Sequence, residues 1–155
     1  MYRMILFLTT FALSACQTTE APQSSFEKET GEVPKQYIDL TSPNPNHGIL
    51  DYWQVETRID PRYPSTAARD RLSGCVETIV GIDTDGRAAE LAIRFSYPQG
   101  VFDYRAVEAL KEWRWTPANT NQERHPVLAV VKLYFSVANS KNKKAVEAYC
   151  GDSGL

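Results

Sequence analysis

The chain has few of the residues on which most protein chemistry depends. Among its 155 residues are two histidines, His47 and His125, and three cysteines, Cys16, Cys75 and Cys150. The cysteines are too widely spaced for a metal-ligand cluster, and there is no glycine-rich phosphate loop. We therefore expect no catalytic residues, no metal site, no cofactor and no small-molecule substrate, and we expect the protein not to be an enzyme.

An excess of positive charge is also absent. The chain carries 17 Lys+Arg against 19 Asp+Glu, a formal net charge of -2. Because neutralising phosphates requires a basic surface, this balance argues against a nucleic-acid partner. A hydrophobic content of 43%, with 11% aromatic residues, is typical of a chain that folds, and the length allows one ordinary domain.

The N-terminus lacks an apolar run long enough to cross a bilayer, which takes about 20 residues. Arg3 precedes an apolar run from Met4 to Ala12, a pattern typical of a secretory signal. The tetrapeptide Leu13-Ser14-Ala15-Cys16 resembles a bacterial lipobox, which implies a signal peptide at residues 1–15 and acylation of Cys16. Gln17 stands where lipoproteins kept in the inner membrane commonly carry aspartate. The resemblance thus implies a lipid anchor in the outer membrane of a Gram-negative bacterium, facing the periplasm. An ordinary signal peptide that happens to contain a cysteine is the alternative.

Residues 16–51 are rich in Thr, Ser, Pro and Glu and have no sustained apolar period. We interpret them as a flexible tether. The folded domain is expected at residues 52–138, followed by a tail at 139–155.

The expected domain contains short elements separated by clear turn signals. Its pattern predicts a helix at 66–72 with Ser65 as its N-cap, a strand at 75–82, a tight turn at 83–86, a second strand at 91–96, a helix at 103–113 and a third strand at 127–137. The fold class is therefore α+β, a small three-stranded antiparallel sheet packed by two helices. Trp113 and Trp115 fit core packing better than a ligand-stacking platform.

Several short motifs occur together in this region. They are Tyr63-Pro64, Ala67, Gly74-Cys75-Val76, Asp83-Thr84-Asp85-Gly86, Ser96, Ala106, Leu110, Trp113-Arg114-Trp115-Thr116-Pro117-Ala118 and Pro126-Val127. In order and spacing they resemble the C-terminal domain of the TonB family, from about Arg58 to Val137.

This resemblance implies a periplasmic protein-binding module without an active site. Family members that transduce energy capture a short extended segment of an outer-membrane transporter by pairing it with the exposed edge of their last strand, which presents unpaired N–H and C=O groups. Mapped here, the candidate partner-binding residues are Arg62, Tyr63, Val127, Leu128, Val130, Lys132 and Tyr134. A purely structural edge, kept soluble by Lys132, is the alternative.

The N-terminal region departs from the energy-transducing pattern. Those proteins have an inner-membrane helix that engages a proton-driven motor, followed by a long linker rich in Pro, Lys and Glu. We find neither feature here and expect a lipid-anchored binding module, linked to outer-membrane transport, that is not itself an energy transducer. Its partner would be a transporter segment or another TonB-like chain. A structural or assembly lipoprotein of the outer membrane is the alternative.

Cys75 and Cys150 remain as an even pair if Cys16 is acylated. In an oxidising compartment we predict that they form a disulfide. The bond would fold the tail across the sheet face that the helix at 103–113 leaves uncovered. A redox-active thiol pair, the other reading, lacks the close Cys-x-x-Cys spacing.

Overall fold

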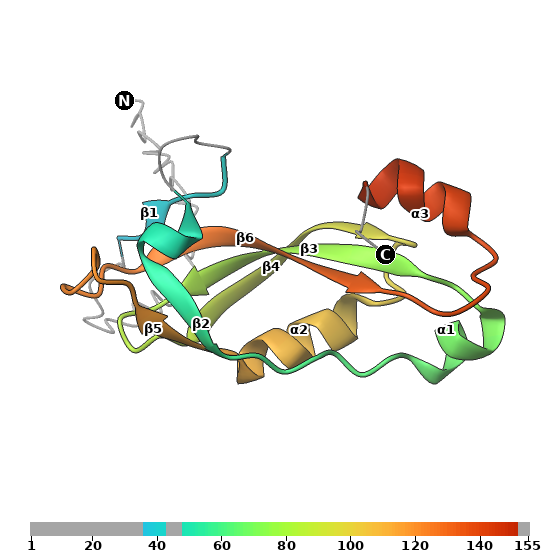
Figure 1. Ribbon diagram of the computed structural model, residues 1–155, viewed down its shortest axis with the longest axis horizontal. Coiled ribbons are helices and arrows are strands. Elements are labelled where there is room, and N and C mark those ends of the chain that lie inside the picture. Colours follow the sequence, from blue (N-terminus) through green and yellow to red (C-terminus); the bar gives the residue numbers. More distant parts are fainter. Residues whose placement is uncertain (1–35, 43–47, 152–155) are drawn as a thin grey trace, which may run out of the picture. The chain divides into compact units, whose positions relative to one another are not determined.

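The structure is a computed structural model that describes residues 36–42 and 48–151. In chain order its elements are β1 (Ile38–Asp39), the 3-10 helix η1 (Ile49–Asp51), β2 (Trp53–Thr57), α1 (Ser65–Asp70), β3 (Gly74–Ile82), β4 (Ala88–Tyr97), α2 (Asp103–Glu112), β5 (Arg114–Pro117), β6 (Val127–Phe135) and α3 (Lys143–Cys150) (Figure 1). The predicted signal peptide, the lipidation site Cys16 and His47 lie outside the described residues.

The main sheet has four strands in the order β1-β6-β3-β4. Strand β3 pairs antiparallel with both β4 and β6, whereas β1 pairs parallel with β6. A second, two-stranded antiparallel sheet joins β2 and β5. The α+β class is confirmed, but a single sheet of three antiparallel strands was wrong: the structure adds β1, β2 and β5.

The β3–β4 hairpin forms where the sequence predicts it. The Asp83 carboxylate accepts hydrogen bonds from the N–H groups of Asp85 and Arg87, each at 2.9 Å. Gly86 has a φ of +72°, and a Cβ at this position would lie 2.0 Å from the carbonyl oxygen of Trp115. Only glycine meets both conditions, so this turn fixes the register of the hairpin.

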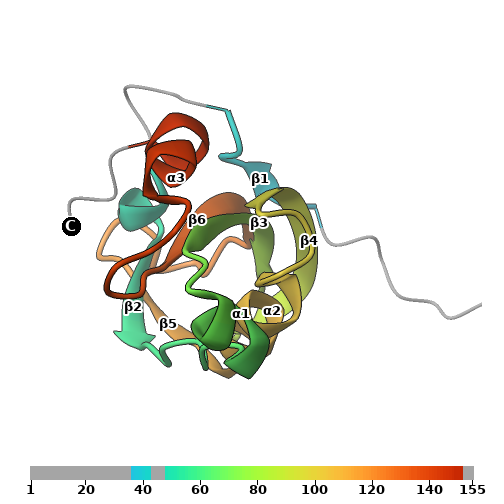
Figure 2. The same cartoon turned by 90° about the vertical axis from the view of Figure 1, so that its right-hand side faces the viewer.

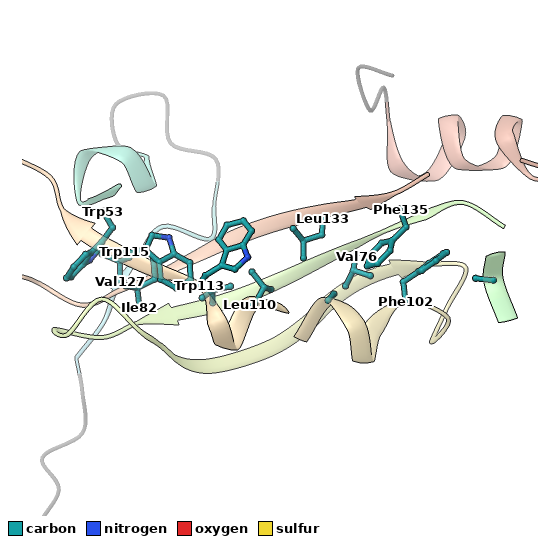
Figure 3. Close-up of a cluster of buried hydrophobic side chains, with 13 residues drawn as sticks. Trp53, Val76, Ile82, Phe102, Leu110, Trp113, Trp115, Val127, Leu133 and Phe135 are labelled. Carbon is teal, nitrogen blue, oxygen red and sulfur yellow. The ribbon is translucent and has the colours of Figure 1, made fainter. Parts of the chain in front are cut away.

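The core lies between the main sheet and α2 (Figure 3). The inward face of β3 consists of Val76, Thr78, Val80 and Ile82, all fully buried. The three tryptophans lie toward one end of the core and Phe102 and Phe135 toward the other. Trp113 and Trp115 are both buried, which agrees with the core-packing interpretation.

Helix α1 begins at Ser65, one residue earlier than expected. Pro64 is the N-cap residue, with φ -63° and ψ 129°, and Ser65 is the first helical residue, not the predicted cap. The helix ends at Arg71, whose φ of 52° is left-handed. The extended conformation that proline favours thus sets the start of the helix.

Helix α3 lies on the face of the main sheet opposite α2 (Figures 1 and 2). The predicted disulfide between Cys75 and Cys150 is present, with an S–S distance of 2.07 Å. Val146 is buried beside it, and the Tyr149 ring stacks on Tyr97 at a centroid distance of 4.7 Å. The tail therefore covers the sheet face on which it was expected.

Two elements, β1 and η1, precede residue 52, where the domain was expected to begin. Ile38, Leu40 and Ile49 pack against the core, although the sequence assigned them to the tether. They are isolated apolar residues in a polar stretch, without a period that would have indicated an element.

Candidate partner-binding site

Strand β6 offers a straight edge for strand pairing. Its register with β3 runs without interruption through nine pairs, from Gly74 opposite Phe135 to Ile82 opposite Val127. On its other side, the carbonyl oxygens of Pro126 and Leu128 accept hydrogen bonds from β1. Because peptide groups alternate in direction along a strand, those of Val130, Lys132 and Tyr134 point to this same side. No strand within residues 36–42 and 48–151 pairs with β6 there beyond Leu128.

The edge is shorter than the sequence predicts. An open edge was expected over residues 127–135, but Ile38 lies opposite Val127 and Asp39 opposite Leu128. The side chain of Val127 is fully buried in the core, and alternation turns its peptide groups toward β3, so this residue is not accessible to a partner strand. The edge left unpaired by β1 begins after Leu128.

Charged and aromatic side chains line the outer face of β6. The ammonium group of Lys132 lies 2.9 Å from a carboxylate oxygen of Glu77 and 5.5 Å from the centre of the Tyr134 ring. The Tyr134 hydroxyl donates a hydrogen bond to the carbonyl oxygen of Cys150 at 3.4 Å. The positive charge of Lys132 is thus balanced within the sheet, which reduces its use for attracting an acidic partner.

Arg62 and Tyr63 lie at the far end of β6. The Tyr63 ring packs edge-on against Phe135 at 6.1 Å and against Phe102 at 5.6 Å. Its hydroxyl donates to the carbonyl oxygen of Leu72 at 2.5 Å, and burial raises the pKa of this tyrosine. Arg62 is exposed. Tyr63 therefore supports the end of the strand, while Arg62 is accessible to a partner.

A family model described as the Gram-negative bacterial TonB protein C-terminal matches residues 59–137, half of the chain. The chain belongs to this family. TonB C-terminal domains mediate protein–protein interactions. The predicted resemblance is therefore confirmed, and the matched region runs from the segment before α1 to the end of β6.

Two solved structures are similar to the chain. The solution NMR structure of the Pseudomonas aeruginosa TonB CTD is 23% identical, covers 56% of this chain and 88% of its own, and has a TM-score of 0.48. The TonB2 protein from Vibrio anguillarum is 24% identical, covers 64% of this chain and 95% of its own, and has a TM-score of 0.42. The comparison with curated proteins found no match.

The opposite edge of this TonB C-terminal domain is irregular. The register of β4 against β3 passes from Phe95 to Ile93 and from Glu90 to Ala88, so Arg94 and Ala89 are extra residues in two bulges. Bulges at an edge hinder the addition of another strand. Of the two long strands beside β3, β6 is therefore the better template.

One of the two histidines, His125, lies in the described part of this TonB domain. His125 is exposed and lies 3.0 Å from the Glu123 carboxylate. Among the described residues no group of three or more His, Cys, Asp or Glu side chains is arranged to hold a metal ion. Within that same part of the chain, no helix has the length and apolar character needed to cross a bilayer.

Strand β1, which lies on the candidate edge, was not expected from the sequence. The signal was present in Tyr37-Ile38-Asp39-Leu40, where apolar residues at 38 and 40 flank an aspartate. A two-residue strand gives too short an alternation to separate from a polar linker.

Proposed function

We propose that this TonB-family chain is a lipid-anchored periplasmic module that binds an extended segment of an outer-membrane transporter by strand pairing. The observation that carries the proposal is the regular outer edge of β6, whose peptide groups at Val130, Lys132 and Tyr134 point away from β3. An incoming strand can satisfy these groups with its own backbone. Affinity then comes from the main chain and selectivity from neighbouring side chains.

The surroundings of the edge support an approach to its far half. A groove of about 520 Å³ lies between the end of β6 and α3 and is lined in part by Tyr134, Phe135 and Lys143. Arg62, whose side chain is exposed, lies three residues before α1, next to Tyr63 and thus at the same end of β6. A transporter segment paired with Val130 and Lys132 would continue into this groove, where side-chain contacts can select among partners.

The anchoring part of the proposal rests on the N-terminal sequence. Cleavage before Cys16 and acylation of its sulfur and amine would hold the module on the outer membrane, because each buried methylene contributes about 0.8 kcal/mol. Such an anchor has no evident connection to a proton-driven motor, so the module would bind its partner without transducing energy. In the native host, Cys16→Ser should abolish incorporation of radiolabelled palmitate. Continued labelling would contradict the anchor without affecting the binding proposal.

The test of strand pairing compares two substitutions at one position. Val130→Pro removes the outward-facing N–H group, whereas Val130→Ala shortens the same side chain and keeps that group. With synthetic peptides that cover the periplasmic N-terminal segments of the host's outer-membrane transporters, we expect Val130→Ala to bind within about threefold of the wild type. We expect Val130→Pro to bind at least about tenfold more weakly, the equivalent of one or two lost hydrogen bonds.

Thermal unfolding of both variants checks that each remains folded at the temperature of the binding measurement. If the two folded variants bind a transporter peptide equally well, pairing at this edge is not the mechanism. If no peptide binds any form of the protein, the transporter is not the partner, and the structural or assembly role becomes the better account.

A further inference from the structure

The chain's own segment β1 uses part of the edge that a partner would use. The N–H groups of Ile38 and Leu40 donate to the carbonyl oxygens of Pro126 and Leu128 at 2.9 and 2.8 Å. Those oxygens lie on the same side of β6 as the peptide groups of Val130, Lys132 and Tyr134. A second strand cannot occupy the space beside Leu128 while β1 remains there.

Side chains hold β1 in place at a specific site on the sheet. Tyr37 lies over Gly81, where an added Cβ would be 3.3 Å from the tyrosine ring and 3.0 Å from the Cβ of Glu90. Burial, followed by the nearby Glu90 carboxylate, raises the pKa of Tyr37. Arg94 donates a hydrogen bond to the carbonyl oxygen of Thr41 at 3.0 Å. This segment therefore contacts β3 and β4 as well as β6.

The attachment of β1 is nevertheless short. Only two residues of the described segment, Ile38 and Asp39, pair with β6, and Ile38 and Leu40 are partly buried. A segment that pairs from Leu128 to Tyr134 would satisfy twice as many outward-facing residues of β6. A longer strand can therefore form more backbone hydrogen bonds with β6 than β1 does, which offsets the advantage that β1 has from being part of the same chain.

We propose that β1 is a built-in competitor for the partner-binding edge and that a partner pairing along the whole of β6 displaces residues 37–41. The proposal rests on the proposed function of this edge. While β1 is bound, only the fraction of molecules with a free edge can accept a full-length strand, and the apparent affinity falls by that fraction. Loosening β1 should therefore tighten binding of a long strand.

The first test uses the segment itself as the probe. A synthetic peptide with the sequence of residues 36–42 (QYIDLTS) is titrated into the ¹⁵N-labelled mature chain, and the dissociation constant is read from the amide shifts of Leu128 and Val130. The variant Ile38→Pro/Leu40→Pro lacks both N–H donors to β6. We expect it to bind the peptide at least about tenfold more tightly than the wild type does.

The control is Ile38→Val/Leu40→Val, which keeps both N–H donors to β6 and leaves the hydrogen bond from the Thr41 N–H group to the Asp39 carboxylate in place. It should behave like the wild type. If the double proline variant binds the peptide no better than this control does, β1 does not block the edge. Unchanged shifts for residues far from β1, such as Val76 in β3 and Ala106 in α2, show that the double proline variant is folded. Gly81→Ala, whose added Cβ would press on the Tyr37 ring, provides an independent way to loosen β1.

The second test follows displacement directly in the wild-type chain. Chymotrypsin cleaves after Tyr37 only when this segment leaves the sheet, so a transporter peptide that pairs along β6 should raise the rate of that cleavage at least about fivefold. A peptide that binds without raising the rate overturns displacement but leaves the proposed function intact. If no transporter peptide binds, the proposed partner is wrong. The titration with the QYIDLTS peptide is independent of that result and still decides whether β1 blocks the edge of β6.

Discussion

We expect loss of the Cys75–Cys150 disulfide to lower the free energy of unfolding by about 4 kcal/mol. The bond joins residues separated by 75 positions in the sequence. Closing a loop of that length corresponds to roughly 4 kcal/mol when the effect is assigned to the entropy of the unfolded chain. The variant Cys75→Ala/Cys150→Ala also removes sulfur atoms from sites that are 0% and 1% exposed, which adds a smaller cavity cost.

Urea unfolding followed by tryptophan fluorescence measures this loss, because Trp53, Trp113 and Trp115 all lie in the core. With a slope of about 1.5 kcal/mol per molar, a change of about 4 kcal/mol moves the midpoint by about 2.7 M. Treating the wild type with a thiol reductant should produce nearly the same midpoint as the double alanine variant.

The matched control is Val146→Ala, which weakens the packing of α3 but keeps the covalent link. Val146 is 8% exposed, and deleting two methyl groups should cost about 1.5 kcal/mol. If the double alanine variant loses no more stability than Val146→Ala, or if the reductant leaves the midpoint unchanged, the loop-closure reasoning is refuted.

Four further predictions concern single positions. Tyr63→Phe should lower the free energy of unfolding by about 1 kcal/mol in urea titrations, because it removes the bond to Leu72 and keeps both aromatic contacts; a loss above about 3 kcal/mol would contradict this. Gly86→Ala should cost at least about 3 kcal/mol, whereas Gly100→Ala, at a φ of +77° with open space around it, should cost about 1 kcal/mol; equal losses would show that the contact with Trp115 is unimportant. Gly81→Ala should raise chymotryptic cleavage after Tyr37, whereas Gly48→Ala, which meets nothing within 4 Å, should not. Folding raises the pKa of Tyr37 above its value in the unfolded chain, which is about 10. The stability that this neutral tyrosine contributes is fully present below a pH of about 10 and is lost as the pH rises through the pKa of the folded state. The free energy of unfolding measured between about pH 9 and pH 11.5 should therefore fall more steeply in the wild type than in Tyr37→Phe.

The parts of the fold that the sequence predicts well are those in which several local signals agree. The β3–β4 hairpin combines strict alternation with an Asp-Gly turn, and Asp83 and Gly86 act in the structure as that motif requires. Helix α2 was expected at 103–113 and occupies Asp103–Glu112, because its apolar stripe marks the helical residues. It ends before Trp113, which is already extended, and the Thr116-Pro117 pair that was expected to end it lies in β5. The disulfide followed from the even number of cysteines left after acylation, together with the expected compartment.

Strands β2 and β5 could not be predicted because neither has a local pattern of its own. Strand β2 buries only Trp53 of its five residues, and the others are exposed. Strand β5 begins two residues after α2 ends and consists of Arg114–Pro117, which reads as the end of a helix. Each strand is stabilised by pairing with the other and by the burial of Trp53 and Trp115. Pairing between segments so far apart in the sequence produces no local pattern in either one.

The orientation of residues along the last strand was predictable from the sequence, but the pairing of its edge was not. Alternation determines which residues face outward, and the structure places the peptide groups of Val130, Lys132 and Tyr134 on one side of β6. How many of them are unpaired depends on whether another segment of the chain pairs with the same edge. That segment, Ile38–Asp39, lies about 90 residues earlier in the sequence and forms only two residue pairs with β6. The energy of so short a strand is a small difference between packing and chain entropy, which sequence patterns do not resolve.

The length of a partner's strand has a direct consequence for how it binds. A short segment that pairs only with Val130, Lys132 and Tyr134 can bind while β1 stays in place, and its affinity should not change when β1 is loosened. A longer segment that reaches Leu128 competes with β1 and should gain affinity when β1 is loosened. Truncating one transporter peptide residue by residue, and measuring each length on the wild type and on Ile38→Pro/Leu40→Pro, therefore locates the point of competition. If the ratio of the two affinities is the same at every length, β1 and the partner do not share an edge.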